Sequence, residues 1–253
     1  WQNLTRPRYC IIPREGDPRL IIPAGQAIIA KRTAGWIKDV RTWLAPQPED
    51  DGVSLVVEAL KDCSGKFNRV GAELGPESRM TMPVGDFLKI QEALKPIDIV
   101  DGDWMLRKMR MIKSPGEIEL IRYVCQLVSH AFEALPEKLH MGDTERIAAE
   151  KFQLDVLRNG GEKIVYFICT SGKNGYPCIN LGPSDHVLEN GDVLIIDTGV
   201  TYEGYYCDFD RDFSFGTPSD EVKRAYDVVW RATEAGIKAA RPGSSTYDVW
   251  HAQ

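Results

Sequence analysis

The chain has 253 residues and a formal net charge of −6; 43% of its residues are hydrophobic and 27% are charged. This composition is ordinary for a globular protein, and the length suffices for one large domain or two modest ones. With an acidic balance and no dominant basic patch, we expect neither nucleic acid nor membrane as a partner, and no apolar run is long enough to span a bilayer.

The cysteines show no CxxC pair and no spacing typical of a disulfide framework. Several lie inside apolar segments, as Cys169 does in Tyr166-Phe167-Ile168-Cys169. We therefore expect free thiols, a reducing compartment and a cytoplasmic location rather than disulfides or a zinc–thiolate site. No secretory signal is visible. The six residues are Cys10, Cys63, Cys125, Cys169, Cys178 and Cys207.

The first hundred residues alternate short apolar segments with helical patterns, which predicts a small α/β domain. A helix is expected over Pro83–Leu94, and strand and helix compete from Val53 to Asp62. Asp98–Asp103 is expected to form an edge strand and a linker, with the domain boundary between residues 105 and 106. The strand candidates are Tyr9–Ile12, Leu20–Ile22, Ala27–Ala30, Val53–Val57 and Val70–Glu73.

The next region opens with a strong helix start. Ser114-Pro115-Gly116-Glu117 has the pattern of a capping box with proline at the first helical position, and this helix should run to about Leu135. A second helix is expected from Gly142-Asp143-Thr144-Glu145 to Gly160. Strands should follow, over Lys163–Cys169, Asp192–Asp197 and Tyr205–Phe215.

The order of elements then begins again. A long helix is expected from Asp220 to Ala240, followed by a glycine turn at Gly243 and another helix start. Long helix, glycine turn and second helix thus occur twice, which indicates an internal duplication. We expect a second set of strands beyond Gln253, and a chain that is truncated at both ends.

Acidic residues gather on two consecutive predicted strands. The apolar run Val193–Ile196 ends at Asp197, and after a short glycine-containing turn Asp208, Asp210 and Asp212 alternate with phenylalanines. Because side chains alternate along a strand, these three carboxylates should share one face.

Three like charges on one strand face repel each other, and aspartate is a poor strand former. Arg211 points to the other face in an ideal strand, so a bound cation is the simplest compensation, with Asp197 and Asp208 as hard oxygen ligands. The alternative is a solvated ribbon with one acidic side. The pattern by itself leaves both interpretations open.

Two segments resemble the creatinase, prolidase and aminopeptidase P group of metallohydrolases, family M24, which has the pita-bread fold. The first runs from Leu106-Arg107 to Ile112–Glu119, and the second combines Gly191–Gly199 with Gly204-Tyr205, Asp208 and Arg211. The resemblance covers nearly the whole chain. It implies a mixed α/β (α+β) fold, with a creatinase-like N-terminal domain over 1–105 and the first part of a pita-bread catalytic domain over 106–253, whose second half is missing.

The resemblance also implies a metal centre. In that family the first hairpin aspartate binds one metal ion and the second bridges two divalent ions, which here correspond to Asp197 and Asp208. Manganese, cobalt, zinc or iron would suit a carboxylate-rich site. A histidine and two glutamates from the second half normally complete it, and this chain ends before them. His251 is expected to be an ordinary helix residue.

The chain departs from the family pattern in two places. Where family peptidases usually carry a substrate-contacting histidine, this chain has Asn180, which can donate a hydrogen bond to a developing oxyanion but cannot shuttle a proton near neutral pH. Nearby His186 is expected to be a solvated turn residue. The second departure is at Asp210 and Asp212, where hydroxyl residues commonly flank Arg211; their role stays open.

The resemblance implies a homodimeric, dinuclear-metal hydrolase of small amides or X-Pro peptides, acting through a metal-bridging hydroxide, with Asn180 as a catalytic residue. Asn180 raises a second possibility, a creatinase-like C–N hydrolase or another small-molecule enzyme on the same scaffold. A metal-free binding module is the alternative from another class, and the pair of Asp197 and Asp208 argues against it. The chain alone, with two metal ligands, is expected to bind metal weakly and to be inactive.

Overall fold

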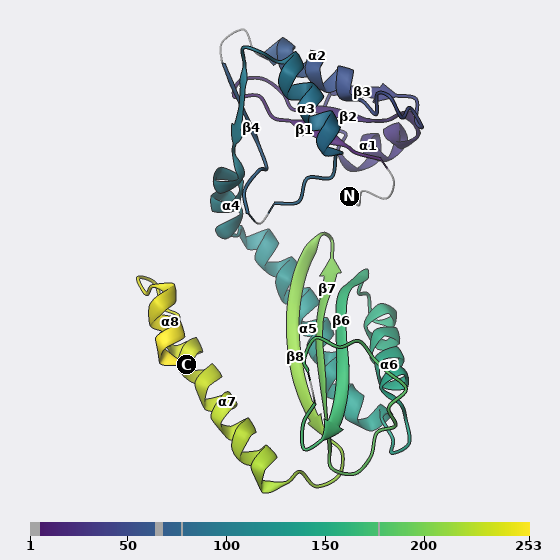
Figure 1. The fold of residues 1–253 in the computed structure, drawn as a ribbon, viewed down its shortest axis with the longest axis vertical. Coiled ribbons are helices and arrows are strands. Elements are labelled where there is room, and N and C mark those ends of the chain that lie inside the picture. Colours follow the sequence, from purple (N-terminus) through teal and green to yellow (C-terminus); the bar gives the residue numbers. More distant parts are fainter. Residues whose placement is uncertain (1–5, 64–67, 77, 177) are drawn as a thin grey trace. The chain divides into compact units, whose positions relative to one another are not determined.

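The structure is a computed structural model that describes residues 6–63, 68–76, 78–176 and 178–253 (Figure 1). The chain divides into two compact units, Trp1–Ile112 and Lys113–Gln253. The division falls between helices α4 (Asp103–Met111) and α5 (Pro115–Lys138), and the boundary expected between residues 105 and 106 lies within α4. Over the described ranges, no helix has the length and apolarity needed to cross a membrane.

The first unit has two small sheets with helices packed on them. In one sheet β2 (Arg19–Pro23) pairs antiparallel with β1 (Tyr9–Ile11) and parallel with β3 (Asp39–Trp43), and in the other β4 (Arg69–Ala72) pairs parallel with β5 (Asp98–Asp101). The helices are η1 (Ala24–Gln26), α1 (Ala27–Thr33), α2 (Val53–Cys63), α3 (Val84–Ala93) and α4. Their largest core cluster includes Ile21, Trp43, Val53, Val56, Ala59, Leu60, Ile90 and Leu94.

The strand predicted over Ala27–Ala30 is wrong. This segment is the first part of α1, because Ile28 and Ile29 are exposed, only Ala30 is buried, and the 3-10 turn η1 leads directly into helical backbone. Strand β3, which pairs with β2, was not predicted. The segment beginning at Val53, where strand and helix competed, is a helix, and the edge strand expected from Asp98 is present as β5.

The second unit packs two helices on one face of an antiparallel sheet. The sheet has the order β6 (Lys163–Lys173), β7 (Asp192–Tyr202), β8 (Tyr205–Ser214), and Figure 1 shows α5 and α6 (Glu145–Arg158) beside it. The core between helices and sheet is apolar and includes Val124, Val128, Phe132, Ala148, Phe152, Val156, Cys169, Leu194, Ile196 and Val200.

The capping box predicted at the start of α5 is present. The Ser114 hydroxyl accepts from the Glu117 backbone N–H at 3.3 Å, and Glu117 Oε2 accepts from the Ser114 N–H at 2.6 Å. The predicted end at Leu135 is wrong, because α5 continues through Pro136 to Lys138. Proline removes a single backbone donor there, in the last turn, and the Leu135 carbonyl still accepts from the Leu139 N–H.

Two further helices follow the sheet, α7 (Asp220–Ala239) and α8 (Thr246–Ala252). Gly142 before α6 and Gly243 before α8 both have a φ of 93°, so the same left-handed glycine precedes the second helix of each pair. The repeated order of elements is therefore present as predicted up to α8. The second set of strands stays a prediction.

Candidate metal centre

The hairpin between β7 and β8 fixes how the acidic residues face each other. Glu203 and Gly204 form its two-residue turn, with φ values of 49° and 80°, the combination that a type I′ turn requires. The turn pairs Tyr202 with Tyr205, and counting back along the strands places Asp210 opposite Asp197. Asp208 lies opposite Gly199, and so diagonally from Asp197.

The predicted alternation along β8 is present. Phe209 and Phe213 stack on Phe132 of α5, with ring centroids 6.3 and 6.2 Å apart, whereas Asp208, Asp210 and Asp212 are exposed. Arg211 shares the phenylalanine face: its guanidinium carbon lies 5.1 Å from the Phe209 ring centroid and 5.9 Å from that of Phe132. Its side chain therefore packs on the side opposite the carboxylates, although its charge still acts against the rise in the pKa of Asp210.

Tyr166 of β6 joins the two candidate metal ligands. Its hydroxyl oxygen lies 2.7 Å from Asp197 Oδ1 and 2.5 Å from Asp208 Oδ1. A phenol has one proton, so it can donate to only one carboxylate at a time. Burial, the hydrogen bonds to Asp208 and Asp197, and the charges of the two carboxylates together raise the pKa of Tyr166, so the phenol stays protonated at neutral pH.

Gly199 is the residue that lets this arrangement form. It lies between Tyr166 on β6 and Asp208 on β8, and a Cβ atom there would overlap the Tyr206 ring and hydroxyl and reach 2.7 Å from Tyr166 Cε1. Both tyrosine rings therefore pack directly over the Gly199 backbone, and any larger residue would push Tyr166 away from Asp197 and Asp208.

The outer carboxylates of this face, Asp210 and Asp212, have raised pKa values. Partial burial and the charges of Asp212 and Asp197 raise the pKa of Asp210 to about 6. Burial also raises the pKa of Asp212, although a 3.3 Å hydrogen bond from the Tyr176 hydroxyl acts in the opposite direction. The field of this face thus favours a cation or a proton.

Carboxylate oxygens are suitable ligands for divalent metal ions, and Asp197 and Asp208 are brought together as such a pair. The residues that the structure describes hold no group of three or more histidine, cysteine, aspartate or glutamate side chains arranged to bind a metal. Two carboxylates are fewer ligands than these ions usually take. The pair therefore fits part of a metal site.

Asn180 lies in the segment that runs along the free edge of β6. The Leu181 carbonyl accepts from the Cys169 N–H at 3.1 Å, and neighbouring Ile168 pairs with Asp197 in the sheet. Adjacent strands are about 4.8 Å apart, so the backbone at Asn180 lies roughly 10 Å from that of Asp197. No hydrogen bond links the Asn180 side chain to either aspartate within the described residues.

His186 and His251 lie in different surroundings. His186 Nε2 lies 2.8 Å from Asp192 Oδ2, so this side chain has a specific partner and is more than a solvated turn residue. His251 stacks on Tyr247 within α8, with ring centroids 5.6 Å apart, as an ordinary helix residue.

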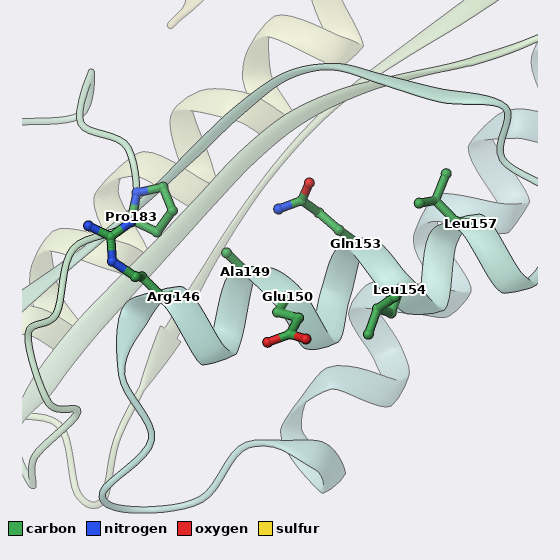
Figure 2. Close-up of a pocket in the computed structure, with 7 residues that line it drawn as sticks. All are labelled: Arg146, Ala149, Glu150, Gln153, Leu154, Leu157 and Pro183. Atoms are coloured by element: carbon green, nitrogen blue, oxygen red, sulfur yellow. The ribbon is translucent and has the colours of Figure 1, made fainter.

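A hollow of about 400 Å³ lies beside α6. Figure 2 shows the side chains that line it. It is lined by Arg146, Ala149, Glu150, Gln153, Leu154, Leu157 and Pro183. None of these residues belongs to the acidic face, so the hollow and the candidate metal centre are different places in the second unit.

Two family models match the chain. The model for metallopeptidase family M24 matches residues 119–253, more than half of the chain, and the model for the creatinase/prolidase N-terminal domain matches residues 5–112. The chain belongs to metallopeptidase family M24. The resemblance expected from the sequence is confirmed.

Curated relatives include a probable dipeptidase, PepE, from Mycobacterium tuberculosis, which is 28% identical over 98% of this chain and 63% of its own length. An Xaa-Pro dipeptidase from Pyrococcus horikoshii is 31% identical over 67% of this chain and 48% of its own length. The M24 chain thus spans less than two thirds of the length of these relatives.

Solved structures of M24 peptidases share the fold. An X-Pro aminopeptidase from Thermotoga maritima superposes with a TM-score of 0.72 at 28% identity, over 90% of this chain and 61% of that one. A prolidase from Thermococcus sibiricus gives a TM-score of 0.78 at 25% identity, over 93% and 61%. The predicted α/β fold, with a creatinase-like domain and pita-bread elements, is confirmed.

Proposed function

We propose that this chain provides part of the active site of a dinuclear-metal hydrolase that cleaves small amides, with X-Pro peptides as the leading substrate class. Membership of family M24 and relatives named as dipeptidases and Xaa-Pro dipeptidases support the reaction class. The observation that carries the proposal is the pair of Asp197 and Asp208, held on one sheet face across the Tyr166 hydroxyl.

The geometry supports a cation at this pair for an electrostatic reason. Two carboxylates approach a single phenolic oxygen, and the phenol proton can satisfy only one of them. The other carboxylate oxygen is left without that hydrogen bond, and Arg211 lies on the opposite face. A divalent ion would compensate the charge of both carboxylates.

Each residue has a proposed role. Asp197 would hold one divalent metal ion and Asp208 would contribute to holding two, with manganese, cobalt, zinc or iron as suitable ions. The ions, when bound, would supply an acidified water as the nucleophile and would polarise the amide carbonyl. Tyr166 orients the two carboxylates, and Asn180 donates a hydrogen bond to the oxyanion.

One observation favours a second candidate. Asn180 stands where family peptidases usually have histidine, so proton transfer to a peptide leaving group lacks that residue. A C–N hydrolase of a small non-peptide substrate, as in creatinase, or another small-molecule enzyme, is the alternative on the same pair of carboxylates. A metal-free binding module is less favoured, because it has no use for two carboxylates forced together at Tyr166.

We further propose that the domains span 1–105 and 106–253, that the second part of the catalytic domain supplies the remaining ligands, and that the protein is a cytoplasmic homodimer. The 253-residue chain alone is expected to bind metal weakly and to be inactive, since its described residues contribute two carboxylates to the site.

The test is hydrolysis of an Xaa-Pro dipeptide and of creatine by the natural polypeptide that contains this chain, with Mn²⁺, Co²⁺, Zn²⁺ or Fe²⁺. Cleavage of the dipeptide that is lost in Asp208→Asn and kept in Asp227→Asn supports the peptidase. Asp227 is an apt control because it is an exposed carboxylate of α7 that pairs with Arg231. Turnover of creatine alone would favour the second candidate, and undiminished turnover in Asp208→Asn would contradict both.

A further inference from the structure

A buried carboxylate outside the acidic face connects three segments of the second unit. Glu145 is the first residue of α6 and is 2% exposed. Its Oε1 accepts from the Ser171 N–H at 2.5 Å and from the Ser171 hydroxyl at 2.7 Å. Its Oε2 accepts from the Ser184 N–H at 2.8 Å and from the Ser184 hydroxyl at 2.6 Å.

Ser171 lies on β6, and Ser184 lies on the segment between β6 and β7. β6 is an edge strand of the sheet, with β7 on one side only. The Cys169 N–H at its free edge binds the Leu181 carbonyl, and the Ser171 N–H two residues further binds Glu145. Glu145 and Leu181 thus take the place of a neighbouring strand at this edge.

Backbone contacts extend the same connection along the segment. The Glu145 N–H donates to the His186 carbonyl at 3.1 Å, and the Arg146 N–H donates to the Ser184 carbonyl at 3.2 Å. The segment therefore lies across the start of α6 and is attached there by both side-chain and backbone hydrogen bonds. Asn180 is four residues before Ser184 and directly precedes Leu181.

We propose that Glu145 is a positioning residue that holds the Asn180 segment against the free edge of β6. The effect of Glu145 on catalysis rests on the proposed function, whereas the attachment of the segment does not. Glu145 touches neither of the candidate metal ligands in the described structure. It acts through Ser171 and Ser184, and fixes the distance between Asn180 and Asp197 through β6.

The Glu145→Gln variant keeps the size of the side chain but replaces one acceptor oxygen by an amide donor. Whichever way the amide turns, its NH₂ group faces the backbone N–H of either Ser171 or Ser184. The hydrogen bonds to at least one of these two serines are therefore lost. Asp103→Asn is the matched control. Asp103 is also a buried carboxylate at the first position of a helix, α4, and accepts from the Ser78 hydroxyl at 2.7 Å.

Amide hydrogen exchange of the natural polypeptide tests the attachment independently of activity. In Glu145→Gln we expect exchange to become at least about tenfold faster at the hydrogen-bonded amides of Cys169, Ser171, Ser184 and Leu188, with the core of α5 and β7 unchanged. Asp103→Asn should leave that segment as in the wild type. Unchanged exchange in the segment, or equal acceleration throughout the second unit, would overturn the proposal.

Kinetics then test the consequence for Asn180. In an active enzyme we expect Glu145→Gln to lower kcat about tenfold with little change in KM, and Glu145→Gln with Asn180→Ala to be no slower than Asn180→Ala alone. Additive losses would overturn the positioning role. A wild type that hydrolyses no amide would contradict the proposed function, while the exchange experiment would still decide whether Glu145 holds the segment.

Discussion

Gly199 permits the close approach on which the candidate metal centre depends. We expect Gly199→Ala to destabilise the second unit by about 1–3 kcal/mol, because the added methyl group must displace Tyr166 or Tyr206. Chemical denaturation measures this loss. Gly182→Ala is the control, since a Cβ atom there has no neighbour within 4 Å. Equal stability of Gly199→Ala and the wild type would contradict the packing of both rings over this residue.

We expect the charge of Glu145 to make the free energy of unfolding depend on pH. Burial raises its pKa, but hydrogen bonds from Ser184 and Ser171 outweigh burial and leave the pKa below the ordinary value of 4.5. Ionised Glu145 therefore stabilises the fold above about pH 4.5, and this contribution disappears as the pH falls through the lowered folded-state pKa.

Urea denaturation of wild type and Glu145→Gln between about pH 3 and about pH 7 tests this dependence. The variant should be less stable at neutral pH, and the difference should shrink on acidification. A difference that stays constant over this range would show that the charge of Glu145 has no part in stability.

At the residue scale the sequence predicts most of the acidic face. The alternation of Asp208, Asp210 and Asp212 with phenylalanine follows from the strand period, as does the place of Arg211 on the other face. Tyr166 could not be predicted as their partner, because its place beside Gly199 depends on the register of β6 against β7, which includes an irregularity between Ile164 and Tyr166. Local pattern carries no information on that register.

Glu203, in the turn between β7 and β8, has a left-handed backbone conformation that suits glutamate poorly. Glu203 has a φ of 49°, and its side chain is exposed. Asparagine tolerates this conformation better and is preferred before glycine in a type I′ turn. We expect Glu203→Asn to raise the free energy of unfolding by about 0.5–1 kcal/mol, measured by urea denaturation.

Glu203→Ala is the control for that substitution, because it removes the same side chain without favouring a positive φ. It should give no gain in stability. The backbone N–H of residue 203 donates to Glu162 Oε2 at 3.0 Å in the present chain and is unaffected by either change. A gain as large in alanine as in asparagine would show that the turn conformation is not the cause.

At the scale of elements, the predictions of helix starts succeed where capping residues mark the start. The start of α5 was predictable because Ser114 and Glu117 form a capping box, and α7 has a similar start at Ser219, which accepts from the Val222 N–H. Ala27–Ala30 was predicted wrongly because two exposed isoleucines look like a strand in sequence. Whether such residues enter a sheet depends on packing that the local pattern does not contain.

At the scale of the whole molecule, family membership was predicted mainly from the order in which sequence motifs follow each other along the chain. The segment from Leu106 to Glu119 and the acidic hairpin of Asp197 and Asp208, in that order along the chain, identified family M24, and the family models cover both units. The relative placement of Asp197, Asp208 and Tyr166 needed the structure. So did the role of Glu145, because a glutamate at a helix start is usually an exposed capping residue.

The central claim is that Asp197 and Asp208 form part of a metal site. Titration of Mn²⁺ into the 253-residue chain, followed by calorimetry or by the paramagnetic resonance of the ion, tests it most directly. We expect weak binding that Asp208→Asn abolishes and that Asp227→Asn, on α7, leaves unchanged. Binding that is equal in wild type and Asp208→Asn, or absent from the wild type while the fold stays intact, would contradict it.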